Sequence, residues 1–347
     1  MAILPPQPGE PDEDYYNRLD TLNVGAYWRL NLNEQASAPV PYVWPWKELY
    51  PALADSVELI DLERGGAERR VITVANPGRK PAMGATHTLT ASLQMILPGE
   101  VAPAHRHSFA ALRFIITGHG AYTVVDGEKC PMEAGDLILT PNGTWHDHGN
   151  EGSEPMVWLD GLDVPLVAAL RATWYQDYPG RVAQPVERQE PASLNRFGGG
   201  AVTAVKNRPT TAYSALMMYK WSMAYEALQR LQESEHDPCE GAILEYVNPV
   251  NGGHVMPTLG CYLQALQPGF HGQAHRHTSS TVYFVVRGSG KTIVDDQELA
   301  WEQNDIVAIP NWQWHEHVAG DQETVLFSFT DQPALEALDL YREEVRA

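Results

Sequence analysis

The stretch that decides the fold runs from Gly99 to Asn150. It opens with Gly99-Glu-Val-Ala-Pro-Ala-His105-Arg-His107 and ends with Pro141-Asn-Gly-Thr-Trp-His146-Asp-His148-Gly-Asn150. Between these two motifs lie short apolar and β-branched runs separated by Gly, Asp-Gly and Pro-Asn-Gly turns, a pattern that predicts strands. Residues two apart in a strand point to one face, so His105 and His107 project together.

A third imidazole, that of His146, follows on a later predicted strand and completes a facial set of three nitrogen ligands. Imidazole suits iron, zinc, copper and nickel, and a facial set leaves positions open for other molecules. A single His-x-His pair on a strand is more often incidental than a metal site, so the pair alone decides nothing.

The pattern recurs in the second half of the chain. Gly269 precedes His275 and His277 at the spacing of Gly99, His105 and His107, and Pro310-Asn-Trp-Gln-Trp-His315-Glu-His317 repeats the later motif. Most of the 13 histidines fall in these two matching clusters. An internal repeat over this length favours two similar domains, each with its own imidazole cluster.

These motifs resemble those of the cupin proteins, Gly-x5-His-x-His-x3,4-Glu-x6-Gly followed by Gly-x5-Pro-x-Gly-x2-His. The first unit matches the pattern at Gly99, His105, His107, Gly118, Gly135, Pro141, Gly143 and His146. Ala111 stands where the family has its usual Glu. The resemblance therefore implies an all-β bicupin, with two antiparallel double-stranded β-helix barrels and a few peripheral helices.

Further stretches resemble the gentisate 1,2-dioxygenase group, which includes salicylate and 1-hydroxy-2-naphthoate dioxygenases. They are Trp44-Pro-Trp46, Arg64-Gly-Gly, Glu68-Arg-Arg-Val, Ala75-Asn-Pro-Gly78, His105-Arg-His-Ser108, Leu112-Arg-Phe114, Trp158-Leu-Asp-Gly-Leu-Asp163 and Tyr246-Val-Asn-Pro-Val-Asn-Gly-Gly253. The resemblance implies an Fe(II)-dependent enzyme that uses O2 to open an aromatic ortho-hydroxycarboxylate between the carboxyl- and hydroxyl-bearing carbons.

The resemblance also implies a role for each candidate residue. The metal ligands are His105, His107 and His146; the substrate-binding residues are Arg69, Arg113 and Thr90; the catalytic residues are His148, Asp160 and Arg113. The two roles of Arg113 are supported by the residue pattern as well. Arg113 follows His107 by an even number of residues, which puts both on one face of a continuous strand. An Arg inside a barrel needs an anionic partner to offset its burial, and its fork of donors can hold a carboxylate.

The second barrel repeats the ligands as His275, His277 and His315 and can hold a second metal ion. Tyr283 stands at the position that corresponds to Arg113, so the first barrel is the predicted catalytic one.

Which hydroxy acid the enzyme prefers stays open at this point. Gentisate is the leading candidate, since its second ring hydroxyl makes the ring easy to oxidise; salicylate, 5-nitro- or 5-halosalicylates and 1-hydroxy-2-naphthoate are the alternatives. Thr90 corresponds to a bulkier aromatic residue in some salicylate-cleaving members, which implies room for a ring substituent. Two other classes are a non-oxidative cupin metalloenzyme and a non-enzymatic bicupin.

Composition limits the partners. A formal net charge of −20 at pH 7 argues against nucleic acid or an anionic membrane as a partner, so a site for anionic substrates needs its own Arg residues. Three widely spaced cysteines suit a reducing cytoplasm. No apolar run reaches membrane-spanning length, and no signal peptide is evident. The resemblance implies a homotetramer.

We predict an N-terminal arm and wrapping segment at 1–50, a catalytic barrel at 51–175, a linker with a bridging helix at 176–240, a second barrel at 241–330 and a C-terminal helix at 331–347. Within these limits the apolar patterns predict a short helix at 14–26, strands at 57–62 and 69–75, an amphipathic helix at 217–231 and a charged helix at 333–346.

Overall fold

The computed structural model describes residues 2–3, 13–22, 30–31, 38–60, 69–200, 202 and 204–346. The chain divides into two compact units, Met1–Ala38 and Pro39–Ala347. In the first unit β1 (Ala2–Ile3) pairs antiparallel with β2 (Leu30–Asn31), and α1 spans Glu13–Thr21. The predicted short helix at 14–26 is confirmed over its described part.

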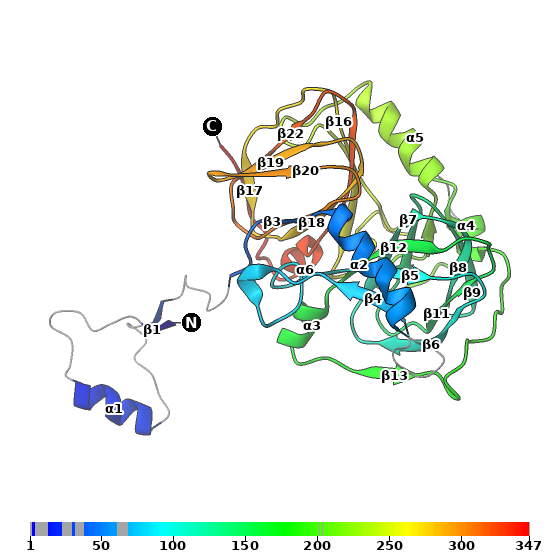
Figure 1. Cartoon of the computed structure of the whole chain (residues 1–347), viewed down its shortest axis with the longest axis horizontal. Coiled ribbons are helices and arrows are strands. Elements are labelled where there is room, and N and C mark those ends of the chain that lie inside the picture. The colour runs from blue at the N-terminus through cyan, green and yellow to red at the C-terminus, as the bar shows by residue number, and fades with distance from the viewer. Residues whose placement is uncertain are drawn as a thin grey trace. The chain divides into compact units, whose positions relative to one another are not determined.

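The first barrel, cyan to green in Figure 1, consists of two antiparallel sheets. The six-stranded sheet has the order β14 (Met218–Tyr219), β10 (Leu137–Thr140), β7 (Ala111–Thr117), β12 (Met156–Leu162), β5 (Thr90–Ile96) and β4 (Arg70–Thr73). The five-stranded sheet has the order β13 (Tyr175–Asp177), β6 (Val101–His107), β11 (His146–Asn150), β8 (His119–Val125) and β9 (Glu128–Glu133).

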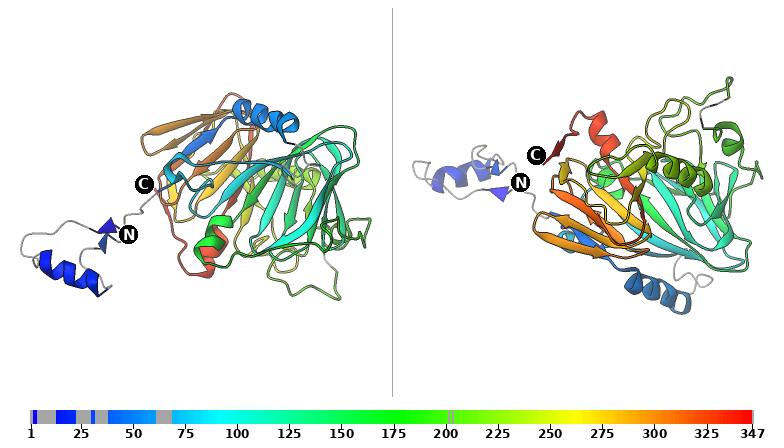
Figure 2. Two further views of the ribbon diagram at one scale, coloured as in Figure 1. Left: turned by 60° about the horizontal axis from the view of Figure 1, so that its bottom comes forward. Right: turned by 90° about the horizontal axis from the view of Figure 1, so that it is seen from above.

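The second barrel, yellow to red in Figure 1 except for the blue β3, has the same plan. Its six-stranded sheet has the order β15 (Ala242–Glu245), β16 (Gly260–Leu266), β23 (Thr324–Thr330), β18 (Thr281–Arg287), β21 (Ile306–Ile309) and β3 (Tyr42–Trp44). Its five-stranded sheet has the order β20 (Gln297–Trp301), β19 (Gly290–Val294), β22 (His315–Ala319), β17 (His275–His277) and β24 (Glu343–Val345). Figure 2 shows the two barrels side by side within the second unit, which confirms the predicted pair of barrels.

Helices lie at the periphery of these sheets. They are α2 (Trp46–Leu59), the short 3-10 helix η2 (Pro77–Arg79), α3 (Val164–Ala169), α4 (Ala192–Phe197), α5 (Trp221–Gln232) and α6 (Gln332–Ala337). Among the described residues, no helix is both long and apolar enough to cross a lipid bilayer.

The strand predicted at 57–62 is wrong where the structure describes it, because Val57 to Leu59 form the end of α2. Leu49, Leu53 and Val57 recur every four residues along this helix and pack into the main core, which is the helical spacing. The apolar residues at 57, 59 and 60 resemble the alternation of a strand, and this short pattern led to the wrong prediction. The strand predicted at 69–75 is confirmed as β4.

The charged C-terminal helix predicted at 331–347 is wrong beyond Ala337, where α6 ends. The chain continues into β24, which pairs antiparallel with β17 through His277 and Glu343. An unpaired strand edge leaves backbone donors and acceptors without partners, so the C-terminal segment is more stable as an added strand than as a solvated helix.

The linker contributes to both barrels. Gln176 and Asp177 were expected at its start but belong to β13, which pairs with β6. The predicted amphipathic helix is confirmed as α5. Its Trp221 amide donates to Asp136 of the first barrel at 2.9 Å, and Tyr225 donates to Glu323 of the second at 3.1 Å. The helix therefore contacts both barrels, as predicted.

The six-stranded sheets of the two barrels pack against each other through one core. Phe114 of β7 stacks on Phe327 of β23 with ring centroids 4.2 Å apart, and both belong to the cluster that spans the two barrels. Successive side chains of a strand point to opposite faces, so Phe114 faces the second barrel while its neighbours Arg113 and Ile115 face the interior of the first.

A partly exposed ion-pair cluster joins β15 to α6 and gives a prediction on pH. His254 lies with Nδ1 2.5 Å from a Glu245 oxygen and Nε2 2.8 Å from a Glu336 oxygen. Glu245, and then Glu336, raise the pKa of His254 to about 9 despite burial. The folded-state pKa exceeds the unfolded value near 6.5, so the stabilisation is complete below about pH 6.5 and is lost as pH rises through about 9.

We therefore expect His254→Gln to lower the thermal midpoint by a few degrees at pH 6 and to leave it unchanged near pH 10. Calorimetry of both proteins across this range measures the difference. A midpoint difference that does not depend on pH would contradict the ionic role of His254. The variant Glu336→Gln, which removes only one acceptor, should show a smaller difference of the same sign.

Candidate active site

A cavity of about 550 Å³ opens into the first barrel. It is lined by all but one of the predicted first-barrel site residues, namely Arg69, Thr90, His105, His107, Arg113, His146 and Asp160. A concave site with a few convergent polar groups in an otherwise apolar lining is typical of small-molecule binding. These predicted residues therefore lie together in one cavity.

The three histidines meet at the inner end of this cavity. His105 and His107 come from β6, and His146 of β11 lies directly opposite His105 in the strand register. One ligand atom from each residue lies within 4.8 Å of the others. All three side chains are buried, so a metal ion held here would be well shielded from bulk water.

Backbone carbonyls orient two of the imidazoles. His107 Nδ1 donates to Phe109 O at 2.8 Å, and His146 Nδ1 donates to Thr144 O at 3.1 Å. With the proton on Nδ1, each Nε2 keeps its lone pair, which is the usual arrangement of metal-bound histidine. His146 Nε2 is buried and finds no hydrogen-bond partner in the part of the chain that the structure describes. The residues present therefore suit a metal ion, which would satisfy that atom.

Burial keeps these imidazoles neutral. It lowers the pKa of His107 to about 4 and that of His105 to about 2, and the positive charges of Arg113 and Arg69 add to the effect. A metal ligand must be the neutral form. The three nitrogens are therefore available at neutral pH without first losing a proton.

Arg113 is an inward-facing, buried cation on β7. Its Nη1 donates to Thr140 Oγ1 at 2.8 Å, and its Nε lies 3.2 Å from Asp160 Oδ1 on the adjacent strand β12. Burial lowers the pKa of Arg113 to about 10, opposed by Asp160, so it stays charged at neutral pH. Asp160 compensates Arg113 within the barrel wall.

Arg69 adds a second cation to the cavity, and neither of its two hydrogen bonds within the described part of the chain goes to a carboxylate. Its Nη1 lies 2.5 Å from His105 Nδ1, and its Nη2 donates to Pro103 O at 2.6 Å. Binding of a metal through His105 Nε2 needs the proton on Nδ1, which then cannot accept from Arg69. Metal binding would therefore release Arg69 Nη1 for another acceptor in the cavity.

His148 does not line the cavity. Its ring lies behind His146, with centroids 6.2 Å apart, and packs near Trp158 at 5.4 Å. Thr123 Oγ1 is 2.9 Å from His148 Nδ1. This placement brings His148 close to a ligand histidine but not to the space where a substrate would bind.

Sequence reasoning missed Tyr175 and Gln94, which also line the cavity. Tyr175 lies opposite His107 in the pairing of β13 with β6, and its ring centroid is 5.0 Å from that of His105. This pairing joins residues far apart in the chain, so no local pattern could reveal it. Ala111 lines the cavity as well, which confirms that no carboxylate projects from this position toward the metal.

The second barrel repeats the cluster as His275, His277 and His315, whose ligand atoms also lie within 4.8 Å of one another. Sequence reasoning missed the carboxylate beside them. Glu240 Oε1 lies 3.0 Å from His275 Nε2, and Glu240 belongs to the segment predicted as linker.

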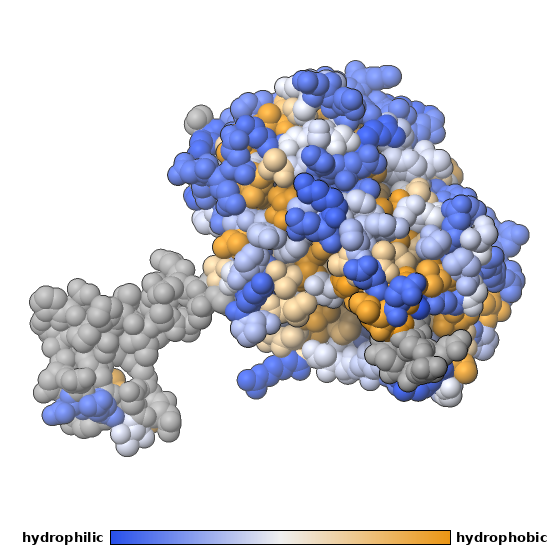
Figure 3. Space-filling model, in the orientation of Figure 1, coloured by the Kyte–Doolittle hydropathy of each residue, from blue (hydrophilic) through white to orange (hydrophobic). Residues whose placement is uncertain are grey.

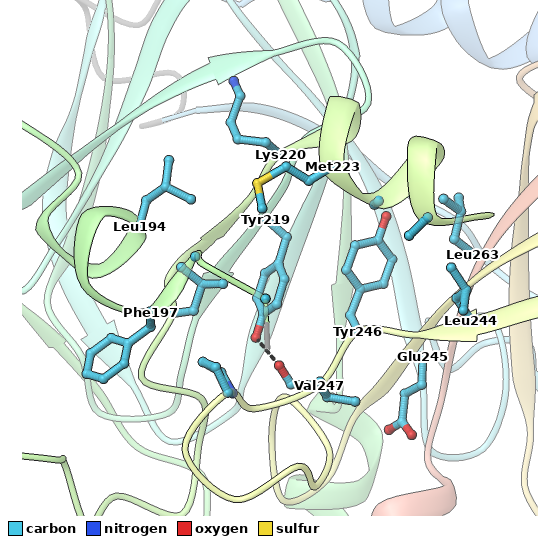
Figure 4. A pocket seen from close by; sticks show the side chains of 16 residues that line it. Leu194, Phe197, Tyr219, Lys220, Met223, Leu244, Glu245, Tyr246, Val247 and Leu263 are labelled. Atoms are coloured by element: carbon cyan, nitrogen blue, oxygen red, sulfur yellow. Dashed lines mark hydrogen bonds between the residues drawn. The ribbon is translucent and has the colours of Figure 1, made fainter. Parts of the chain in front are cut away.

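A separate apolar cavity of about 310 Å³ lies between α4, α5 and β15. Figure 4 shows Phe197, Tyr219 and Tyr246 among its lining residues, with the Tyr219 hydroxyl donating to Val247 O at 2.8 Å. Neither of the histidine clusters lies among its lining residues. Because this apolar cavity contains neither histidine cluster, the cavity of the first barrel is the better candidate for the active site.

Comparison with known proteins agrees with this geometry. The family described as cupin domain matches residues 92–163 and 262–330. The chain is 40% identical to 5-aminosalicylate 1,2-dioxygenase of Comamonas sp. (88% of this chain, 82% of the relative) and 37% identical to gentisate 1,2 dioxygenase 1 of Aquipseudomonas alcaligenes (95% of each). Salicylate 1,2-dioxygenase from Pseudoaminobacter salicylatoxidans, solved with gentisate, superposes with a TM-score of 0.90 at 30% identity (99% of this chain, 97% of that chain).

The paired barrels with their buried imidazole clusters define a bicupin metalloprotein. The chain belongs to the gentisate 1,2-dioxygenase group of ring-cleaving dioxygenases. It is thus an enzyme that cleaves an aromatic ring with O2, and the non-oxidative and non-enzymatic alternatives are set aside.

Proposed function

We propose that the enzyme is an Fe(II)-dependent gentisate 1,2-dioxygenase whose reaction takes place in the cavity of the first barrel. The observation that carries this proposal is the meeting of three neutral imidazoles with the buried Arg113 and the half-buried Arg69 in one cavity. A site of this kind combines a metal with an anion-binding wall, within a chain whose formal net charge is −20. The local cations overcome the unfavourable overall field.

Each arginine has a separate task in this proposal. Arg69, freed from His105 when the metal binds, donates to the substrate carboxylate, for which its planar fork is suited. Arg113, held between Thr140 and Asp160, directs positive charge at the substrate oxygens. Together they orient the ring so that the carboxyl and the adjacent hydroxyl face the histidines.

Bound iron supplies the redox chemistry, by allowing electrons of the electron-rich ring to reach O2. Both oxygen atoms enter the product: the bond between the two substituted ring carbons breaks, one carbon becomes a ketone and the other a carboxylic acid. Asp160 and His148 are proposed to hold protons in place during this change. His148 lies beside His146, with ring centroids 6.2 Å apart, and outside the cavity lining, so its effect on the reaction would pass through that histidine.

Oxygen uptake by anaerobically purified, Fe(II)-loaded enzyme tests the proposal. Gentisate, salicylate, 5-nitrosalicylate and 1-hydroxy-2-naphthoate are supplied in parallel. We expect one O2 consumed per gentisate, a new dienone-acid absorbance, and loss of both in His105→Ala. Iron-loaded enzyme that consumes no O2 with any of these acids would refute the proposed substrate class.

A second candidate substrate is 5-aminosalicylate, because the Comamonas relative that cleaves it is 40% identical to this chain. Its amino group, like the second hydroxyl of gentisate, donates electrons to the ring. The ratio of kcat/KM for the two acids decides between them. A ratio above one for 5-aminosalicylate would transfer the assignment to that substrate.

Thr90 should control how large a ring substituent the cavity accepts. It lines the cavity from the first position of β5, and Thr90→Tyr would fill space that the small side chain leaves open. We expect kcat/KM for the bulkiest accepted acid to fall roughly 10- to 100-fold relative to salicylate. Thr90→Val, nearly equal in volume, is the control; an equal change in both variants would exclude a steric cause.

Three further features are part of the proposal. Iron as the native metal is tested by elemental analysis of the purified enzyme, and a cytoplasmic location by cell fractionation. A homotetramer is supported by apolar residues that gather in patches on the face shown in Figure 3 and by exposed apolar side chains such as Trp174 and Val182. Light scattering that gives a monomer mass at micromolar concentration would exclude the tetramer.

A further inference from the structure

The histidines of the second barrel are oriented as metal ligands. Nδ1 of His275, His277 and His315 faces a backbone carbonyl two residues away, at 3.4, 2.8 and 3.0 Å respectively. Donation from Nδ1 leaves the lone pair on Nε2, and one ligand atom from each residue lies within 4.8 Å of the others. His315 Nε2 is buried and has no hydrogen-bond partner within the described ranges.

A carboxylate completes this set from outside the two cupin motifs. Glu240 Oε1 lies 3.0 Å from His275 Nε2, and its other oxygen lies 4.0 Å from Nε2 of His317. Gln264 of β16 fixes the carboxylate by donating to Oε2 at 2.5 Å and to the Glu240 carbonyl at 2.7 Å. Glu240 is therefore held in place by a dedicated side chain rather than extended into solvent.

The approach of Glu240 to His275 is informative. When Nδ1 of His275 carries the proton, its Nε2 is an acceptor, and two acceptors at 3.0 Å repel. A cation between them removes the conflict, and it would also satisfy His315 Nε2. Either a second proton on His275 or a metal ion would remove this repulsion. Of the two, only a metal ion binds all three imidazoles.

The first barrel has the opposite charge character at the matching positions. There Arg113 pairs in register with Asp160, whereas in the second barrel Tyr283 pairs with Ser328. Gln94 of the first barrel faces the open cavity, whereas its counterpart in the second, Gln264, holds Glu240. The first barrel thus contains arginines, which suit an anionic substrate, and the second contains the carboxylate of Glu240, which suits a metal ion.

We propose that the second barrel binds a divalent first-row transition metal ion through Nε2 of His275, His277 and His315 and the carboxylate of Glu240, and that this ion stabilises the barrel and takes no part in ring cleavage. Three imidazoles with one carboxylate are a donor set for Mn, Fe, Co, Ni or Zn. A carboxylate 3.0 Å from His275 Nε2 also disfavours an anionic substrate at this cluster, because like charges repel. This inference is independent of the substrate proposed for the first barrel.

Metal content per chain tests the proposal. We expect two metal ions per chain in the wild-type protein, one in His105→Ala/His107→Ala, one in His275→Ala/His277→Ala and none when all four are replaced. Ring cleavage per chain should be lost in the first double variant and kept in the second. One metal per chain in the wild type, with none left in His105→Ala/His107→Ala, would overturn the proposal even if ring cleavage is as proposed.

The role of Glu240 is tested in the His105→Ala/His107→Ala background, where only the second centre remains. Adding Glu240→Gln should weaken Co(II) binding by about tenfold or more and alter the visible d–d bands; Glu235→Gln, an exposed acid of the same segment, should do neither. Co(II) should also raise the thermal midpoint in this background. Identical Co(II) spectra and affinity with and without Glu240→Gln would exclude the carboxylate as a ligand, and an unchanged midpoint would exclude a stabilising ion.

Discussion

Ring cleavage should be lost in His146→Ala and retained in His315→Ala. The two substitutions are matched: each removes a fully buried imidazole that lies opposite the first histidine of a His-x-His pair, His105 in one barrel and His275 in the other. Only the first barrel combines this cluster with a cavity that contains Arg69 and Arg113. The activity of the two variants therefore identifies the catalytic barrel.

The expected loss in His146→Ala is about a thousandfold or more in kcat/KM, larger than the 10- to 100-fold typical of residues that only support a ligand. The fold should survive, because His146 Nε2 has no hydrogen-bond partner among the described residues. The one hydrogen bond that its side chain makes within them, from Nδ1 to Thr144 O, is worth about 1 kcal/mol. Steady-state kinetics with elemental analysis measure both effects. Equal losses in the two variants, or loss in His315→Ala alone, would contradict the assignment.

The histidine ligands could be predicted because their signal is local and repeated. A His-x-His pair on a strand fixes two side chains on one face, and the second copy shows that the spacing is not accidental. Arg113 also lines the predicted cavity, though not for the reason that the sequence suggested. The argument assumed one continuous strand from His107, whereas β6 and β7 belong to different sheets. Arg113 reaches the cavity because it faces inward from β7, as the alternation around Phe114 shows.

The parts that could not be predicted depend on pairings between distant segments. Tyr175 enters the site because β13 pairs with β6, and Glu240 reaches His275 from a segment with no strand-like pattern of its own. The C-terminal tail forms β24 because β17 offers it an edge. In each case the partner's free edge or cavity, rather than the segment's own sequence, decides the conformation.

Replacing Arg113 by leucine should reduce kcat/KM by about a hundredfold and also destabilise the fold. The kinetic loss follows from removing a charge-assisted contact to the substrate, worth roughly 1.5–3 kcal/mol. The loss of stability follows from Asp160, which remains buried without its partner 3.2 Å away; breaking a buried pair in this way costs about 3–5 kcal/mol. Arg113→Lys keeps the charge but not the fork of donors and should be intermediate in kcat/KM.

The double variant Arg113→Leu/Asp160→Asn separates the two effects. Neutralising Asp160 removes the unpaired charge, so chemical denaturation should show most of the stability restored while kcat/KM stays low.

Low pH should likewise restore part of the stability of the single variant Arg113→Leu. Burial already raises the pKa of Asp160, and Arg113 opposes that rise. Without Arg113 the folded-state pKa lies further above the unfolded value, so the neutral acid favours the fold at low pH and the deficit grows as pH increases. Full recovery of kcat/KM in the double variant would show that Arg113 serves the fold alone and binds no substrate.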